Sequence, residues 1–478
     1  MNKHIFPLMV AAALLVLTGG RLQAHSLTIG ILGDQTGSPD LEQSYRIMAQ
    51  GIETLNREKV DLVLHVGDLL ESSREEAEIR RDFHTATTLL SRLRKPWYMT
   101  PGDHDVNPPQ RVADSPDRSR ETLFQELIAT VVPEAADRLY YSFDHGGYHF
   151  VALNSQEHLH ADPRWGNTFL ARISQEQQQW LKDDLHQHRQ ATGTIVFLHQ
   201  PLWYNWAGWL PVHQVLKEHG VLAVLAGHFH YDQDDGELDG IRYRVIGASG
   251  ASIKNASRNA GGMHQVGVLT LENRNIKYKL LDAQTGEKVR FTPRADADRV
   301  QAVDYALGAL SGFADANRFF LQNNQLVDTC TTEQPAEIRL YNIGNPIDLP
   351  VTFEIEVDSA AFTLTGPRFA EGLCRHSDNG LHCDLPPGAG IAVSNPSTAS
   401  ACFPTCPTPV HPETLRPVVA LPKPVWSSFI SPTSGQEFKE DTRLQMQVRM
   451  YFQAEEGQMM VQRSVQSQPL RHCSEGQP

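Results

Sequence analysis

Cysteine is absent from the first 329 of the 478 residues, and all six cysteines lie in the last third of the chain. They are Cys330, Cys374, Cys383, Cys402, Cys406 and Cys473. Six thiols can pair in many ways, and their spacing does not choose among them. An oxidising compartment would favour disulfides. A zinc site is the alternative, although the spacing is irregular and no CxxC pair occurs. We therefore expect a disulfide-bearing C-terminal region.

The chain also lacks the excess of positive charge that nucleic-acid binding requires. Its formal net charge is −14, whereas a phosphate backbone is bound by a basic surface. We therefore expect no nucleic-acid-binding surface, although a metal site could still attract a phosphate group locally. The content of 40% hydrophobic residues is otherwise ordinary for packed globular structure.

A long apolar run stands only at the start of the chain, in residues 1–24. Lys3 precedes an apolar stretch of 13 residues from Ile5 to Leu17, and Leu22-Gln23-Ala24 is an acceptable cleavage site. A membrane span needs about 20 residues, so we expect a cleaved signal peptide, with an uncleaved anchor as the alternative. No later stretch could span a membrane. The mature protein is expected to be periplasmic or secreted.

A chain of 478 residues is too long for one core. From residue 25 to residue 290, apolar runs such as LTIGILG, DLVLHVG, TIVFLH and VLAVLAG predict buried strands. Between strands, SYRIMAQGIETLNREK, EEAEIRRDFHTATTLLSRL and SQEQQQWLKDDLHQHR have the apolar spacing of surface helices. This alternation predicts an α/β domain with a largely parallel or mixed sheet. At its end, IRYRVIGAS and HQVGVLTLEN are expected to pair as antiparallel strands.

A polar stretch separates this domain from a second one. We expect a linker and helix over residues 291–324, with the helix running roughly from Val300 to Leu321. In residues 325–478 the hydrophobic pattern changes to period two, for example from Val351 to Val357. Such alternation is typical of a β-sandwich.

Acidic and imidazole side chains follow five of the predicted strands. They are Asp34, Asp68, Asp103 with His104, His199, and His228 with His230. Open α/β sheets place ligand sites at the carboxyl ends of their strands, and these side chains bind divalent metals. Taken singly, each could be a turn former, a helix cap or a buried histidine. Their occurrence after five separate strands indicates a metal site instead.

The five segments together resemble the motifs of the calcineurin-like metallophosphoesterases. Those motifs run Asp-x-His, Gly-Asp, Gly-Asn-His-Asp/Glu, His and Gly-His-x-His. Here they stand as Asp34-Gln35-Thr36, Gly67-Asp68, Gly102-Asp103-His104-Asp105, His199 and Gly227-His228-Phe229-His230. The resemblance covers roughly residues 27–275. It implies an αββα sandwich for the catalytic domain, to which the C-terminal β-sandwich is appended.

The resemblance further implies two divalent metal ions, for which manganese, iron and zinc are all compatible. The ligands would form two sets that share one bridging carboxylate: Asp34, Asp68 and His230 for the first metal, and Asp68, Asp103, His199 and His228 for the second. A metal-bridging hydroxide would attack phosphorus, so no cysteine or serine nucleophile is required. His104 would protonate the leaving oxygen, and Asp105 would orient its ring.

Two positions depart from the family motifs. Thr36 replaces the histidine of the first motif, so the first metal loses an imidazole unless Gln35, water or another residue substitutes. Asp103 replaces asparagine, and three carboxylates with a bridging hydroxide would bring the formal charge of the site to zero. A neutral site attracts a phosphate dianion less strongly than a cationic one. We therefore hypothesise a preference for singly charged phosphodiesters, or a lower overall rate.

The resulting hypothesis is an exported, metal-dependent phosphoesterase that hydrolyses phosphomonoesters or phosphodiesters of a small phosphorylated substrate. The alternative is a catalytically degenerate metal-binding protein whose β-sandwich binds a glycan or a protein partner. The retention of His104, Asp105 and the histidine ligands favours the enzyme. The sequence leaves the oligomeric state open.

Weaker candidates flank the motifs. Trp203 and Trp206, which follow His199, could stack on a substrate ring or simply pack in a loop. His158 and His160 lie in a predicted loop that could reach the site. The segment YDQDDGELDG, after His230, is expected to be a solvated acidic turn.

Overall fold

The computed structural model describes most of the chain between residues 26 and 469. The gaps are residues 37, 39, 72–74, 108–117, 163–165, 254–257, 259–260, 313–323, 328–336, 341–342, 370–372, 378, 390–425, 434–442 and 455–456. The predicted signal peptide lies outside the described residues. Among the described residues, no helix has the length and apolar character needed to cross a membrane.

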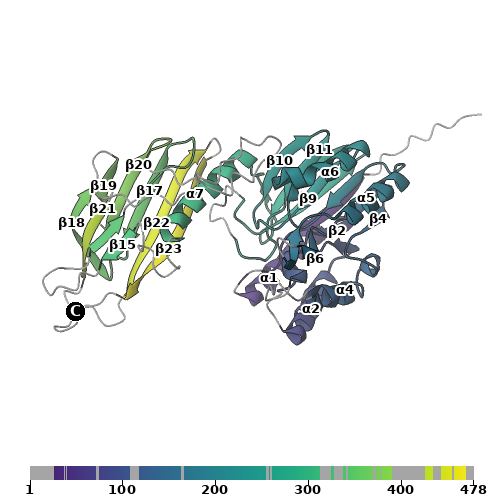
Figure 1. The fold of residues 1–478 in the computed structure, drawn as a ribbon, viewed down its shortest axis with the longest axis horizontal. Helices are drawn as coiled ribbons and strands as arrows, with labels where there is room; N and C mark the ends of the chain where they lie inside the picture. Colours follow the sequence, from purple (N-terminus) through teal and green to yellow (C-terminus); the bar gives the residue numbers. More distant parts are fainter. Residues whose placement is uncertain are drawn as a thin grey trace, which may run out of the picture.

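Two six-stranded mixed sheets form the first domain (Figure 1). The first sheet, in the order β14-β13-β12-β1-β2-β3, contains β1 (Ser26–Leu32), β2 (Leu62–His65), β3 (Trp97–Met99), β12 (Gln265–Glu272), β13 (Asn275–Asp282) and β14 (Lys288–Val289). The second sheet, in the order β10-β11-β9-β8-β5-β4, contains β4 (Tyr141–His145), β5 (Tyr148–Ala152), β8 (Thr194–Phe197), β9 (Ala223–Ala226), β10 (Gln233–Leu238) and β11 (Ile241–Val245). In the first sheet, β1, β2 and β3 run parallel, whereas β12, β13 and β14 pair antiparallel on the other side of β1. In the second sheet, the central strands β5, β8, β9 and β11 run parallel, and the edge strands β4 and β10 are antiparallel to their neighbours.

Neighbouring side chains of one strand enter two different cores, which defines the order of the layers. Phe150 of β5 packs in the core shared with the first sheet, whereas Val151 packs in the core beneath the helices. Phe197 and Val196 of β8 divide in the same way. Successive side chains of a strand point to opposite faces, so the second sheet lies between the first sheet and a layer of helices.

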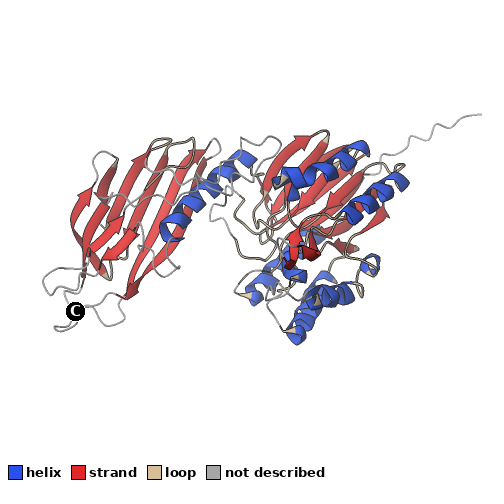
Figure 2. Cartoon of the chain, viewed as in Figure 1, coloured by secondary structure: helices blue, strands red, loops and turns tan. Residues whose placement is uncertain are grey.

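The helices of this domain cover the outer faces of the sheets (Figure 2). They include α1 (Leu41–Arg57), α2 (Glu76–Leu90), α4 (Ser119–Ile128), α5 (Gln175–Gln187) and α6 (Trp206–Glu218). Asp40 caps α1 by accepting a hydrogen bond from the amide of Gln43 at 2.9 Å. Leu55 of α1 packs over Gly30 of β1, which places this helix on the first sheet. The domain is therefore the expected αββα sandwich.

The strands predicted to close the domain as a pair lie in different sheets. β11 pairs with β10 and β9, whereas β12 pairs with β1 and β13. Each strand has a nearer partner across a tight turn, at Asp239-Gly240 and at Asn273-Arg274. Asp239, Gly240 and Asn273 have positive φ angles of 54°, 80° and 56°, which suit the short turns of β-hairpins. The segment predicted to be a loop with His158 and His160 is also a hairpin, formed by β6 (Gln156–Asp162) and β7 (Gly166–Ala171). The two histidine side chains lie outside the described residues.

The second domain consists of two antiparallel sheets around one hydrophobic core. One sheet contains β15 (Asn324–Val327), β16 (Glu337–Leu340), β21 (Trp426–Pro432) and β18 (Phe362–Phe369). The other contains β19 (Cys374–Ser377), β20 (Gly380–Leu385), β17 (Val351–Val357), β22 (Arg443–Ala454) and β23 (Gly457–Pro469). A disulfide between Cys374 and Cys383 joins β19 to β20. This architecture is the expected β-sandwich; the other four cysteines lie outside the described residues.

One helix, α7 (Arg294–Gly312), stands between the two domains (Figure 1). It begins six residues before the predicted start at Val300, and the predicted end at Leu321 lies outside the described residues. Val303 and Leu307 pack in the core of the second domain, while Asp304 pairs with Arg463 of β23 at 3.0 Å. On the other side α7 contacts β10 of the first domain. Arg294, the first residue of the helix, lies over the ring of Tyr204 in the first domain.

Candidate metal centre

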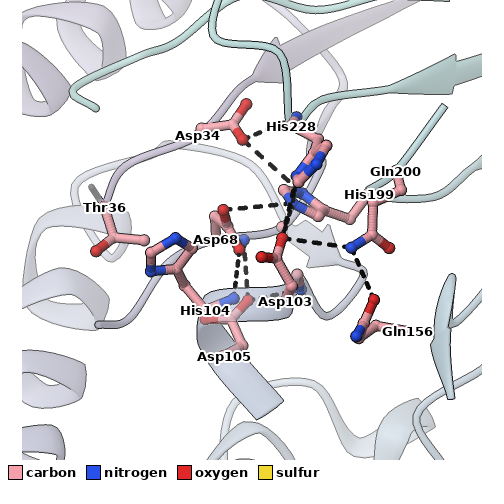
Figure 3. Close-up of polar contacts among 12 residues, drawn as sticks. Asp34, Thr36, Asp68, Asp103, His104, Asp105, Gln156, His199, Gln200 and His228 are labelled. Atoms are coloured by element: carbon pink, nitrogen blue, oxygen red, sulfur yellow. Dashed lines mark hydrogen bonds and ion pairs between the residues drawn. The ribbon is translucent and has the colours of Figure 1, made fainter. Parts of the chain in front are cut away.

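The side chains singled out as metal ligands converge at one edge of the αββα sandwich (Figure 3). Each comes from a connection that follows a strand: β1, β2, β3, β8 or β9. The described residues offer two ligand sets whose donor atoms lie within 4.8 Å of one another: Asp68, Asp103, His199 and His228, and Asp34, Asp68 and His230. Both sets contain Asp68. The structure thus brings together all six residues that the sequence indicated.

Three of these side chains stand on left-handed backbone. The φ angles of Asp68, His228 and His230 are 58°, 72° and 61°. Residues other than glycine adopt such angles rarely, and the conformation costs free energy that the surrounding structure must offset. Here it turns the chain sharply after β2 and β9, so that the side chains face the cluster.

Asp103 lies at the centre of the larger set. Its Oδ1 is 3.0 Å from both His199 Nε2 and His228 Nδ1, and these two nitrogens are 3.2 Å apart. Asp68 Oδ2 is 3.3 Å from His199 Nε2. Burial alone would raise the pKa of Asp103, but the hydrogen bonds with His199 and His228 lower it well below its usual range. The carboxylate is therefore ionised.

The smaller set is more deeply buried. Asp34 is fully buried; its Oδ1 accepts the amide of His228 at 2.8 Å and lies 3.6 Å from His230 Nε2. Its Oδ2 is buried without a hydrogen-bond partner. A buried carboxylate oxygen normally has a partner, so a cation at this position would satisfy it.

Backbone carbonyls fix the orientation of two imidazoles. His199 Nδ1 donates to the carbonyl of Val66 at 2.9 Å, and His230 Nδ1 donates to that of Ser252 at 2.7 Å. Each ring therefore presents Nε2 to the carboxylates. Metal-binding histidines are commonly held in this way by their other nitrogen.

The electrostatics of the cluster also favour a cation. Burial opposes a charge on His199, yet Asp68 and Asp103 outweigh it and raise the pKa of the ring well above its usual value. The oxygen and nitrogen donors suit divalent metals of intermediate hardness. Together with the unpartnered oxygen of Asp34, these features show that the residues fit a pair of divalent metals.

Neither Thr36 nor Gln35 takes the place of the histidine that the first motif of the family has at position 36. The Thr36 hydroxyl donates to Glu71 Oε2 at 3.1 Å. The side-chain amide of Gln35 donates to Ser44 at 2.9 Å and its oxygen lies against Gly250. Both side chains are engaged in these contacts, and Asp34, Asp68 and His230 are the carboxylate and imidazole donors that the described residues bring together at the first position.

The orientation of His104 depends on a residue that the sequence reasoning missed. His104 Nδ1 lies 2.9 Å from Glu71 Oε1, and this hydrogen bond raises the pKa of His104 to about 9. The expectation that Asp105 orients the ring is wrong. Glu71 follows Asp68 by three residues in the second motif, and that spacing was the available signal.

Asp105 organises the loops instead. Its Oδ1 accepts the amides of Leu69 and Leu70 at 3.0 and 2.8 Å, and its Oδ2 accepts those of Asp68 and Gly102 at 2.9 and 2.8 Å. All four donors are backbone groups of the second and third motifs. The carboxylate is buried, and both of its oxygens are used by these amides rather than by the His104 ring.

A chain of amides supports Asp103 from the side opposite His104 (Figure 3). Gln200 Nε2 lies 3.4 Å from Asp103 Oδ1 and 2.8 Å from Gln156 Oε1. Gln156 in turn donates to Asn107 at 3.1 Å. The oxygen of Gln200 accepts the hydroxyl of Ser155 at 2.8 Å, which fixes the orientation of the amide. Nothing in the sequence pattern indicated these residues.

Two motif glycines allow the close approach of the loops. A Cβ atom on Gly102 would lie 2.1 Å from Asp68 Oδ1, and one on Gly67 would lie 2.8 Å from His199 Nδ1. Gly67 also has a φ of 97°. Both glycines are thus required by space, and Gly67 is required by its backbone conformation as well.

The weaker candidates do not line the centre. Trp203 is fully buried, and its indole N–H donates to Asp235 at 2.6 Å, so it cannot stack on a substrate. Trp206 packs against the ring of His213 on α6. The segment predicted to be an acidic turn contains β10, and Asp232, just before this strand, and Asp235, within it, are both buried. Asp232 is paired there with Arg244 at 2.9 Å.

The match of one segment to a family model agrees with the geometry of the site. Residues 27–232 match the model of the calcineurin-like phosphoesterase family, whereas no curated protein matches the chain. Purple acid phosphatase PPD1 from yellow lupin (Lupinus luteus) seeds is 15% identical, with a TM-score of 0.42 over 57% of this chain and 55% of that chain. A dimetal phosphatase from Danio rerio is 14% identical, with a TM-score of 0.38 over 53% of this chain and 98% of that chain. Residues 27–232 are therefore a calcineurin-like phosphoesterase domain within this chain.

Proposed function

We propose that this protein is an exported metal-dependent phosphoesterase that hydrolyses phosphomonoesters or phosphodiesters. The observation that supports it most directly is the position of Asp68, whose carboxylate belongs to both ligand sets. A shared carboxylate between two donor sets suits a pair of divalent metals. Such a pair would polarise a phosphoryl group and activate water for attack on phosphorus.

The chain itself supplies the acid. Glu71 binds Nδ1 of His104 and favours the protonated ring, which leaves Nε2 as the nitrogen able to reach a leaving oxygen. The ring is 35% exposed, so a bound substrate can approach it. The amide of His104 also donates to Asp68 Oδ1 at 2.9 Å. This contact fixes the distance between the acid and the metal ligands.

Asp68, Asp103 and Asp34 together determine which substrate charge the site favours. Three carboxylates nearly neutralise two divalent cations, so a dianionic monoester gains less attraction than it would with asparagine at position 103. We infer a relative preference for a small, singly charged phosphodiester. Gln200, which contacts Asp103, holds that carboxylate toward the histidines.

The domain organisation is part of the same proposal. Residues 1–24 act as a signal peptide and residues 25–290 carry catalysis. Residues 291–324 connect this domain to a disulfide-bearing β-sandwich in residues 325–478. The disulfide between Cys374 and Cys383 supports an oxidising location, either periplasmic or secreted.

The first test measures metal per chain by elemental analysis, in protein purified without chelator, for the wild type and Asp68→Ala. We expect two equivalents attributable to this centre in the wild type and a sharp loss in the variant. Turnover of an aryl phosphate and a bis-aryl phosphodiester is then compared with that of His104→Ala, which should retain metal but lose activity.

The outcomes separate the two interpretations. Loss of turnover with unchanged metal in His104→Ala supports the phosphoesterase. Metal binding without turnover of either substrate would favour a degenerate metal-binding protein. Failure to bind manganese, iron or zinc at all would contradict both.

A further inference from the structure

A second group of metal-binding side chains lies at the opposite end of the second sheet. Asp144 of β4 and His149 of β5 are direct cross-strand neighbours. His149 is also paired with Thr194, at the beginning of β8, whereas His199 follows the end of that strand. His188 caps the C-terminal end of α5. The group is therefore separated from the proposed metal centre by the length of the strands.

The donor atoms of this group are close together. His149 Nδ1 is 2.8 Å from Asp144 Oδ1, and His188 Nε2 is 3.9 Å from Asp144 Oδ2. One donor atom from each residue lies within 4.8 Å of the others. The two imidazoles are stacked, with centroids 3.9 Å apart and planes inclined by 10°. An imidazole nitrogen binds a metal in the plane of its ring, so the partly exposed His188 ring would have to tilt for both rings to bind one ion.

Asp184 holds the other nitrogen of each ring. His149 Nε2 lies 2.8 Å from Asp184 Oδ2, and His188 Nδ1 donates to the Asp184 backbone carbonyl at 2.8 Å. The hydroxyl of Ser142 donates to Asp184 Oδ1 at 2.6 Å and fixes the carboxylate. The nitrogens left for a ligand are His149 Nδ1 and His188 Nε2. This is the support that metal-binding histidines receive from a neighbouring carboxylate or carbonyl.

We propose that Asp144, His149 and His188 bind one divalent transition-metal ion of the zinc class, independently of the phosphoesterase centre. Two imidazoles and one carboxylate are a common zinc donor set, with water as the fourth ligand. His149 is fully buried, while the side chains of His188 and Asp144 are 32% and 61% exposed. The ion would thus enter from solvent and remain open to water.

Such an ion would join the β4–β5 hairpin to the end of α5. Without it, Asp144 and Asp184 would hold His149 as a simple charged pair. Burial opposes the charged form of His149, but hydrogen bonds with Asp184 and Asp144 outweigh it and raise its pKa. His188 also lies 3.9 Å from Asp144 and 3.5 Å from Asp184, so the response to added metal, rather than these contacts, distinguishes a metal site from a group of ion pairs.

The experiment titrates the full chain with Zn²⁺ in the Asp68→Ala background, which weakens the phosphoesterase centre. One equivalent of zinc should remain bound and raise the thermal unfolding midpoint. His188→Phe keeps a ring over His149 but removes the donor, and it should weaken zinc binding at least tenfold and abolish the rise. His186→Ala, an exposed histidine on the same helix, should behave like the parent.

A second readout uses Co²⁺ in the same proteins. Bound at this site, it should give a visible absorption band that His188→Phe and Asp144→Asn both remove. Asp144 is mostly exposed, so its substitution should leave the fold intact. Equal zinc stoichiometry and equal unfolding midpoints in the parent, His188→Phe and Asp144→Asn would overturn the proposal. Neither result depends on phosphoesterase activity.

Discussion

Glu71 Oε1 and His104 Nδ1 lie 2.9 Å apart, across 33 residues of sequence. The same Glu71 accepts the hydroxyl of Thr36, the residue that stands where the family motif has a histidine. The departure in the first motif is therefore connected directly to the proposed acid, through one carboxylate.

Glu71→Gln should reduce kcat and change its pH dependence. The Glu71 hydrogen bond raises the pKa of His104, and an acid catalyst acts while protonated. Removal of the charge lowers that pKa, so the alkaline limb of kcat should move to lower pH. His104→Ala should lower kcat about 10²–10⁴-fold, and the decrease of kcat at alkaline pH should disappear from its pH profile. The pH profile of aryl phosphate hydrolysis tests both variants. If the alkaline limb of kcat in Glu71→Gln stays at the wild-type pH, the role given to the Glu71 carboxylate is refuted.

Asp105→Asn should destabilise the fold and not only affect the proposed catalytic acid, His104. Either orientation of the new amide places an NH₂ group against two backbone N–H donors. Leaving such groups unsatisfied costs about 2–5 kcal/mol in the free energy of unfolding. Thermal unfolding should show a clear decrease together with reduced metal content. Glu71→Gln is the control and should unfold close to the wild-type temperature.

Asp103→Asn should raise activity on phosphomonoesters relative to phosphodiesters. Removing one negative charge makes the metal centre more attractive to a dianion. The measurement is the ratio of kcat/KM for an aryl phosphate to that for a bis-aryl phosphate, at equal metal content. If the ratio and the rates are both unchanged, the charge at position 103 does not determine substrate preference.

Gly102→Ala should displace Asp68 and lower metal content. The new Cβ would lie 2.1 Å from Asp68 Oδ1 and 2.4 Å from its amide, and overpacking of this kind costs about 1–3 kcal/mol. Elemental analysis and thermal unfolding should both detect the change. Gly208→Ala in α6 is the matched control, because the nearest neighbour of its Cβ would be the Asn205 side chain at 3.4 Å. Normal metal content in Gly102→Ala would show that the loop can shift without loss of the site.

Asp235 should make the first domain less stable as pH rises. Burial raises the pKa of Asp235 to about 6, whereas an unfolded aspartate titrates near ~3.9. Between these values the folded state binds more protons, so stability falls with increasing pH by about 3 kcal/mol in total. The difference in unfolding midpoint between the wild type and Asp235→Asn should therefore change from pH 4 to pH 7. Asp183→Asn, at an exposed position on α5, should show no such trend.

Hydrophobic periodicity was sufficient to predict the main architecture. The apolar runs of β1, β2, β8 and β9 and the amphipathic pattern of α1, α2 and α5 are local properties, so they are legible without the fold. The period-two pattern of β17 and β22 predicted the sandwich for the same reason. The predicted pair of β11 with β12 failed, because each strand found a closer partner across a tight turn.

The sequence by itself determined which side chains could gather: carboxylates and imidazoles placed directly after parallel strands must meet at one edge of the sheets. Only the tertiary structure decided how they are supported. Glu71 rather than Asp105 contacts His104, and Gln200 reaches Asp103, because loops from different strands approach one another at distances that sequence spacing does not encode. Asp232 and Asp235 likewise look like solvated acids in the sequence, whereas the fold buries them, Asp232 against Arg244 and Asp235 against Trp203. Burial and hydrogen bonding between distant segments are properties of the packed chain, and they set the chemistry of each side chain.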